Sequence, residues 1–242
     1  MANVKAAWLR QGYFVLGNEG LMPAVRKELE QSLQLPKGHF SIHYYPGHAQ
    51  WRHTYWWREG DDAYAEAQFV AHVSGAYPVL SVGLSVEKGY TVAPLGVVVP
   101  PEQMMTAAWD WHRVLPQLEL VLTKEVPAIA RTLGDVTLRI RTSTAGTDLT
   151  TAKQKRAWSW KAFTYADGTW YERQVGAVHV DTIATYVSAV DAKPDVWAIL
   201  HLVHDLTPAS AEGLSAPDLA HLLRQFDRAR RRLRDLPVTA NP

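Results

Sequence analysis

Two short segments of the sequence place tryptophans directly beside cationic side chains. The first covers residues 51–58, where Trp56 and Trp57 precede Arg58, and the second covers residues 156–161. Flat rings next to cations form a surface on which nucleic-acid bases stack while the cations neutralise phosphates. The residue types in both segments are therefore typical of a nucleic-acid-binding surface.

The second segment belongs to a basic stretch. Between residues 139 and 161, six basic residues stand against a single acidic one, Asp148, whereas the whole chain carries 25 Lys and Arg against 24 Asp and Glu. Clustered cations bind phosphates and make affinity depend on salt. The sequence thus predicts Trp56, Trp57, Trp158 and Trp160 as stacking residues, with phosphate contacts from Arg139, Arg141, Lys153, Lys155, Arg156 and Lys161. Our first hypothesis is a non-enzymatic nucleic-acid-binding protein, with DNA or RNA as its partner.

The same aromatic segments support another interpretation. Tryptophan is large and is usually buried in the core, and Trp, Tyr and Arg also dominate the binding energy of protein–protein interfaces. A module that self-associates through its aromatic strands, as a homo-oligomer, is therefore an alternative. A further run of six arginines lies between residues 224 and 234, and we interpret it as the solvated face of a helix.

Four histidines form the densest titratable cluster. His39, His43, His48 and His53 fall within fifteen residues, and Asp61, Asp62 and Glu66 follow closely. Imidazole is the commonest metal ligand, so a hydrolase or phosphodiesterase that uses these histidines with the nearby carboxylates is the second hypothesis. Strand residues four apart are separated by about 13 Å, so His39 and His43 cannot share an ion on a straight strand. We therefore expect no bound metal.

The absence of certain motifs excludes several classes of site. The chain has no cysteine, which rules out disulfides, zinc–thiolate sites and a cysteine nucleophile. No glycine-rich phosphate loop is present, so we expect no nucleotide cofactor. Residues 1–16 lack the unbroken apolar core of a signal peptide, and no apolar run approaches the roughly 20 residues of a membrane span. We expect a cytoplasmic protein with no membrane partner.

These residues must be positioned by a mixture of strands and helices. Apolar residues every three or four positions predict helices at 21–33, through the region from Met104 to Leu122, at 180–190 and at 217–236. Pro116 and Pro127 are expected to kink or divide the second of these. Alternating or β-branched runs predict strands at 39–45, 51–58, 64–72, 79–86, 136–142, 157–165, 169–175 and 196–203. Asp167-Gly168 is a strong hairpin signal.

The order of these elements predicts the fold class. Runs of strands followed by helices, without strict alternation, indicate an α+β fold with a mostly antiparallel sheet and helices packed on one face. A chain of 242 residues can bury a core without disulfides or metal. We expect a single domain over residues 1–242. Residues 1–134 and 135–242 would form two loosely similar lobes, because each has an aromatic-basic strand, an apolar strand and a terminal helix.

Overall fold

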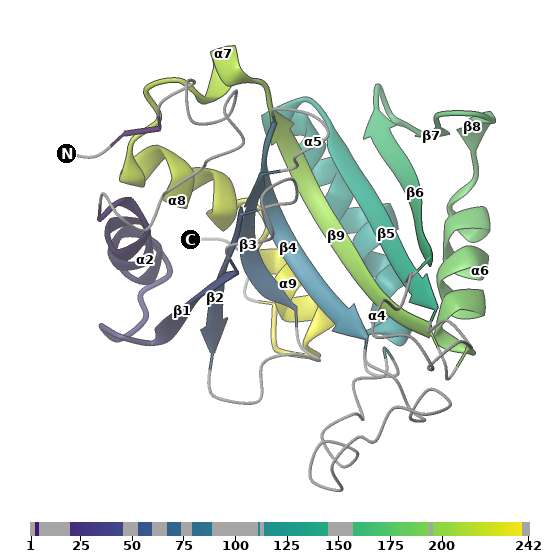
Figure 1. Cartoon of the computed structure of the whole chain (residues 1–242), viewed down its shortest axis with the longest axis horizontal. Coiled ribbons are helices and arrows are strands. Elements are labelled where there is room, and N and C mark those ends of the chain that lie inside the picture. Colours follow the sequence, from purple (N-terminus) through teal and green to yellow (C-terminus); the bar gives the residue numbers. More distant parts are fainter. Residues whose placement is uncertain are drawn as a thin grey trace, which may run out of the picture. The chain divides into compact units, whose positions relative to one another are not determined.

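The computed structural model describes residues 3–4, 20–45, 53–59, 67–73, 79–88, 111, 114–144, 157–193 and 196–238. Within these ranges, nine strands form an antiparallel sheet in the order β1-β2-β3-β4-β9-β5-β6-β7-β8, accompanied by helices (Figure 1). The predicted α+β class is therefore confirmed.

The elements follow the expected order along the chain. The strands are β1 (Phe40–Tyr45), β2 (His53–Glu59), β3 (Gln68–Val73), β4 (Leu80–Lys88), β5 (Val136–Thr144), β6 (Ala157–Ala166), β7 (Thr169–Glu172), β8 (Gly176–Val178) and β9 (Val196–Leu206). The helices are α2 (Leu21–Ser32), α4 (Leu115–Leu120), the π-helix η3 (Val121–Glu125), α5 (Val126–Leu133), α6 (Val180–Asp191), α7 (Pro208–Ala211), α8 (Ala216–Arg224) and α9 (Asp227–Leu233).

The chain groups into two compact units. Unit 1 comprises residues 1–63, 68–84 and 203–230, and unit 2 comprises residues 64–67, 85–202 and 231–242. Residues 203–230 belong with the N-terminal part of the chain, so this grouping does not follow a single cut at residue 134.

In unit 1, one face of the β1–β2–β3 pairing is apolar. Ile42 and Trp57 lie opposite each other on β1 and β2, and Trp57 lies opposite Phe69 on β3. Because side chains alternate along a strand, Phe40 shares this face with Trp57 and Phe69, and all three are buried. Arg230 in α9 lies over the Phe40 and Phe69 rings, at 5.8 and 4.9 Å from their centroids. This contact places α9 on the apolar face.

The first helix packs as its periodicity predicts. Its buried side is formed by residues four apart, which are Leu21, Val25 and Leu29. Glu30 is also buried, and its carboxylate accepts hydrogen bonds from the backbone N–H groups of Gly38 and Phe40, each at 3.0 Å. These bonds attach α2 to the start of β1.

The predicted helix over 217–236 is wrong in one respect, because the chain turns at Gln225 and Phe226 between α8 and α9. Neither residue is a glycine or proline, so the turn carries no local signal in the sequence. The start of α8, in contrast, can be predicted from the sequence. Ser215 and Asp218 form a capping box in which each side chain bonds the backbone N–H of the other, as expected for Ser at the N-cap and an acid at N3.

In unit 2, β5 and β6 form a long antiparallel pair that runs from Val136 opposite Tyr165 to Thr144 opposite Ala157. The predicted hairpin between β6 and β7 is confirmed, since Asp167 and Gly168 have φ values of 51° and 82°, both positive as a type I′ turn requires. The predicted strand over 169–175 is too long. It ends at Glu172, and a turn leads into the short strand β8.

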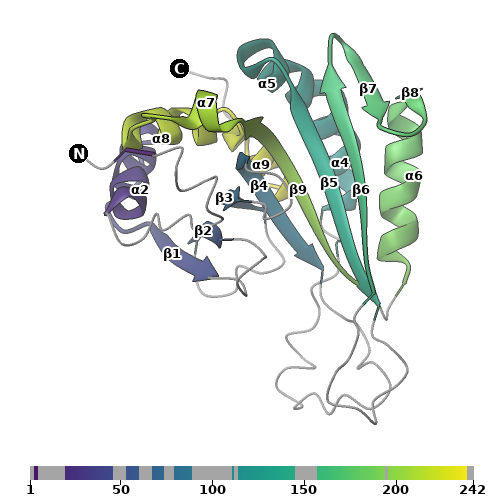
Figure 2. The same ribbon diagram turned by 45° about the horizontal axis from the view of Figure 1, so that its top comes forward.

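Helices cover one face of this strand pair (Figure 2). Leu138, Ile140 and Phe163 point to that face and have no exposed surface. α5 contacts both β5 and β6, and Tyr186 of α6 meets the Phe163 ring edge-on at 6.2 Å. Pro116 and Pro127 each occupy the first turn of a helix, α4 and α5, where a missing N–H is tolerated. The π-helix η3 directly precedes α5, so the hydrogen-bond pattern changes next to Pro127 while the backbone stays helical.

Candidate nucleic-acid interface

The face of β5–β6–β7 opposite these helices carries predicted site residues. Arg139 lies opposite Ala162, Arg141 opposite Trp160, and Thr164 opposite Tyr171. Residues directly opposite each other in an antiparallel pair point to the same side of the sheet. We call this side the open face, and its described members on these strands are Thr137, Arg139, Arg141, Trp160, Ala162, Thr164, Ala166, Thr169 and Tyr171.

Exposure distinguishes the open face from the helix-covered face. Trp160 is 43% exposed and Tyr171 is 41% exposed, among the most exposed large hydrophobic side chains in the described part of the chain. Arg139 and Arg141 are half-buried. Arg139 and Arg141 are the ionisable basic side chains among the described open-face positions.

The central feature of the open face is a stacked pair. The Arg141 guanidinium lies over the Trp160 ring, 5.2 Å from its centroid, which is within the range of a favourable cation–π contact. Trp160 and Thr164 are about 13 Å apart along β6 at the usual rise of a strand, and Tyr171 lies across from Thr164. Ala162, with a short side chain, lies between Trp160 and Thr164 on this face of β6. The open face therefore offers two separated aromatic surfaces, and the one formed by Trp160 has cations beside it.

Lys161 lies on the other side of β6. Its ammonium pairs with Glu172 at 3.0 Å and lies over the Tyr186 ring at 4.8 Å from the centroid. Burial raises the pKa of the Tyr186 phenol, and the Lys161 charge opposes that rise. Lys161 is thus engaged on the helix-covered face, and the structure does not bring it together with Arg139 and Arg141.

The tryptophans predicted in β2 belong to unit 1. Trp57 is only 1% exposed and lies against the apolar face with Phe69, so a base cannot stack on it in the folded protein. The prediction of Trp57 as a stacking residue is therefore wrong. Trp56 and Trp57 are neighbours in β2 and face opposite sides of the sheet, and Trp57 is on the buried side. Trp56 is half-buried, and the Arg58 guanidinium lies 5.4 Å from its ring centroid.

The remaining predicted contacts are not placed. Lys153, Lys155 and Arg156 lie outside the described residues, and Trp158 is described only as a backbone position opposite Ser143. Tyr171 was missed by the sequence analysis. Strand alternation puts Trp170 and Tyr171 on opposite sides of β7, but only the structure shows that Trp170 is the buried one.

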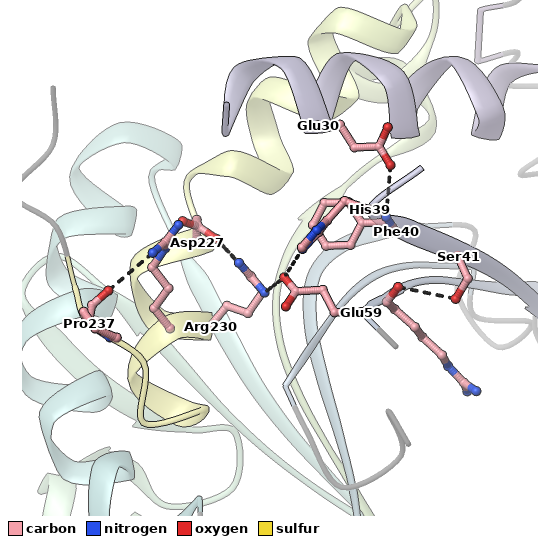
Figure 3. A network of polar contacts seen from close by, with 10 residues as sticks. Glu30, His39, Phe40, Ser41, Glu59, Asp227, Arg230 and Pro237 are labelled. Atoms are coloured by element: carbon pink, nitrogen blue, oxygen red, sulfur yellow. Dashed lines mark hydrogen bonds and ion pairs between the residues drawn. The ribbon is translucent and has the colours of Figure 1, made fainter. Parts of the chain in front are cut away.

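The histidine cluster does not assemble as one site in the described part of the chain. His39 contacts Glu59 at 3.3 Å, and Glu59 also pairs with Arg230, which bonds Asp227 at 2.7 Å (Figure 3). His43 instead bonds the Ser41 hydroxyl at 3.1 Å. His48, Asp61, Asp62, Glu66 and the His53 side chain are outside the described residues.

The described residues contain neither a candidate metal-binding cluster nor a candidate membrane-spanning helix. They hold no group of three or more His, Asp or Glu side chains able to bind a metal ion. None of their helices has the length and apolar character needed to traverse a bilayer.

Comparison with known proteins gives no family assignment for the chain. No protein-family model, curated protein or solved structure matches it.

Proposed function

We propose that the open face of unit 2 binds single-stranded nucleic acid. The observation that carries this proposal is the exposed Trp160 ring, which has the Arg141 guanidinium stacked on it and Arg139 on the same face of the sheet. Sheet faces with exposed aromatics are one of the recurring surfaces on which proteins stack two or three unpaired bases. No covalent chemistry is needed for this activity.

Stacking on exposed rings favours a single strand over a duplex. Stacking requires an unpaired base whose flat face is accessible, and bases inside a duplex already stack on each other. Trp160 and Tyr171 would each take one base, with intervening nucleotides over the small side chains of Ala162 and Thr164. Arg139 and Arg141 would neutralise the phosphates beside Trp160. Duplex of the same sequence should therefore bind more weakly.

The proposal is tested by removing one stacking ring at a time. Trp160→Ala and Tyr171→Ala should each weaken the binding of a labelled oligothymidylate by about 5- to 150-fold, since one base–aromatic stack contributes about 1–3 kcal/mol. Tyr44→Ala is the matched control, because Tyr44 is equally exposed but lies in unit 1. Fluorescence anisotropy at low salt measures all three. Unchanged affinity in Trp160→Ala would overturn the proposal.

The connection between β5 and β6 offers a second test. It carries Lys153, Lys155 and Arg156, in the chain that joins the two strands of the stacked pair. Joint replacement of the three by Ala should weaken binding to every sequence alike, because phosphate contacts carry no base preference. If affinity does not change, these cations do not belong to the interface.

A further inference from the structure

The two rings of the open face have different neighbours. Trp160 lies opposite Arg141, whose guanidinium is stacked on its ring. Tyr171 lies opposite Thr164 on β6, and Thr164 lies opposite Thr137 on β5. Because residues directly opposite each other are about 5 Å apart, Thr137, Thr164 and Tyr171 form a row across three neighbouring strands (Figure 2). The Tyr171 ring therefore has hydroxyl groups beside it, where the Trp160 ring has a cation.

The two threonine hydroxyls in this row are hydrogen-bonded to each other. Thr137 Oγ1 and Thr164 Oγ1 are 3.1 Å apart, and either can be the donor. A threonine hydroxyl has one O–H donor and two acceptor lone pairs, so a bond between two such hydroxyls engages one proton and one lone pair. The chemistry of the pair thus allows it both to donate a hydrogen bond to a ligand and to accept one. We call Thr137 and Thr164 the threonine pair.

The threonine pair lies next to accessible surface of the open face. Thr164 is half-buried, and its neighbours Ala162 and Tyr171 are exposed. Thr137 is only 7% exposed, so Thr164 is the member that a ligand reaches, and Thr137 orients its hydroxyl from the adjoining strand. The branched Cβ of threonine also restricts its rotation in a strand. A ligand that bonds Thr164 therefore has little to order in the protein.

The position of the threonine pair fits the sugar of a nucleotide. A sugar is bonded directly to its base, so a base stacked on Tyr171 places its sugar within about one strand spacing of the ring, roughly 5 Å. Thr164 lies at that spacing, on the next strand. A ribose differs from a deoxyribose by its 2′-hydroxyl, which both donates and accepts hydrogen bonds, as the threonine pair does. A phosphate oxygen accepts only, and it is better matched by the arginines at the Trp160 end.

We propose that the open face binds RNA in preference to DNA, because the threonine pair recognises a ribose 2′-hydroxyl. This inference rests on the proposed function, since it concerns a strand whose bases stack on Trp160 and Tyr171. Thr164 forms a hydrogen bond with the 2′-hydroxyl of the nucleotide on Tyr171, and Thr137 orients the Thr164 hydroxyl. Deoxyribose presents a C–H group at the same position and cannot form this bond. The loss of one neutral hydrogen bond weakens binding by about two- to tenfold.

The test compares oligouridylate with oligodeoxyuridylate, because these two strands differ only in the 2′-hydroxyl. Fluorescence anisotropy with the full chain should show that the ribose strand binds about two- to tenfold more tightly. Thr164→Val removes the hydroxyl and keeps the branched Cβ that suits a strand. It should lower the affinity for oligouridylate to that for oligodeoxyuridylate and leave the affinity for oligodeoxyuridylate unchanged. Thr164→Ser keeps a hydroxyl and should keep the preference for ribose.

A second hydroxyl pair on the same two strands supplies the matched control. Thr142 on β5 and Ser159 on β6 lie opposite each other, with their hydroxyl oxygens 2.6 Å apart. Strand alternation puts them on the other face of the sheet from Arg141 and Trp160. Thr142→Val should therefore leave the affinities for both strands unchanged.

The outcomes separate this inference from the proposed function. If the wild type binds both strands equally or prefers deoxyribose, or if the ribose preference survives in Thr164→Val, the inference is overturned and the proposed function is not. Equal weakening of both strands by Thr164→Val would also overturn it, because the hydroxyl would then contact a phosphate or a base. If the wild type binds neither strand at low salt, both the inference and the proposed function are overturned.

Discussion

Arg230 shows how a single residue can depart from the pattern around it. The arginine run of residues 224–234 predicts a solvated helix face, yet the Arg230 side chain is buried over the Phe40 and Phe69 rings. It pairs with Asp227 and Glu59 (Figure 3). Composition could not reveal this, because the partner Glu59 lies far away in the sequence. The Arg230 side chain therefore joins two carboxylates of unit 1, one from β2 and one from α9.

Replacing Arg230 should therefore be costly. Arg230→Met leaves Glu59 and Asp227 without this cation and should lower the free energy of unfolding by about 3–5 kcal/mol. Urea denaturation measures the change, and Lys27→Ala on the exposed side of α2 is the control. Adding Glu59→Gln to Arg230→Met should restore part of the loss. A cost below about 1 kcal/mol would show that the network does not stabilise the fold.

Ser215 gives a prediction that depends on pH. Hydrogen bonds from the Ser215 hydroxyl and backbone N–H hold the pKa of Asp218 below its usual range. Because the folded-state pKa is the lower one, this contribution is present at neutral pH and is lost as the pH falls through the folded-state pKa. Ser215→Ala should lower the free energy of unfolding by about 1 kcal/mol at neutral pH. The difference in the free energy of unfolding between wild type and Ser215→Ala should become smaller at acid pH. A difference that stays constant would contradict the stabilising role of the Ser215–Asp218 hydrogen bonds.

At the scale of the element, β6 has two faces with different roles. Phe163 has no exposed surface and packs against Tyr186, whereas Trp160 on the open face is 43% exposed. Phe163→Ala should therefore lower the free energy of unfolding by about 3–5 kcal/mol. Trp160→Ala should lower it by about 1 kcal/mol or less, the contribution of its cation–π contact. Equal losses in chemical denaturation would mean that Trp160 belongs to the core and would remove it as a binding residue.

The elements that could be predicted are those with local signals. The four-residue spacing of α2, the Asp167-Gly168 turn and the Ser215 capping box all have causes within a few residues. The turn at Gln225 and Phe226 and the short strand β8 have no such signal. For the candidate site, residue type and clustering in the sequence were enough to predict Arg139, Arg141 and Trp160 as binding residues. It could not show that Lys161 and Trp57 face the other side, because the buried side of each strand is set by what packs on it.

At the scale of the whole chain, the strand order depends on distant pairings. β9 lies between β4 and β5 in the sheet, although more than fifty residues separate it from β5 in the sequence. No local pattern specifies such a neighbour, so the sheet class was predictable and its order was not. The grouping of residues 203–230 with the N-terminal residues in unit 1 likewise depends on contacts between residues that are distant in the sequence.

Self-association remains a distinct prediction at this scale. A module that associates through its aromatic strands should sediment faster as its concentration rises, and Trp160→Ala should abolish that effect. Nucleic-acid binding by the open face requires neither result. If Trp160→Ala prevents association and leaves oligonucleotide affinity unchanged in the same preparation, the exposed ring serves a protein partner.

The central claim is that Arg139 and Arg141 neutralise phosphates of a single strand on the open face. The most direct measurement is the affinity for oligothymidylate at several salt concentrations, in the wild type and in Arg139→Gln/Arg141→Gln. Each phosphate contact contributes about 0.7 to the slope of log affinity against log salt, so the double variant should flatten the slope by about 1.4. The pair Arg131→Gln/Arg224→Gln, exposed on α5 and α8, should leave the slope unchanged. An unaltered slope in Arg139→Gln/Arg141→Gln, or no binding by the wild type at low salt, would contradict the claim.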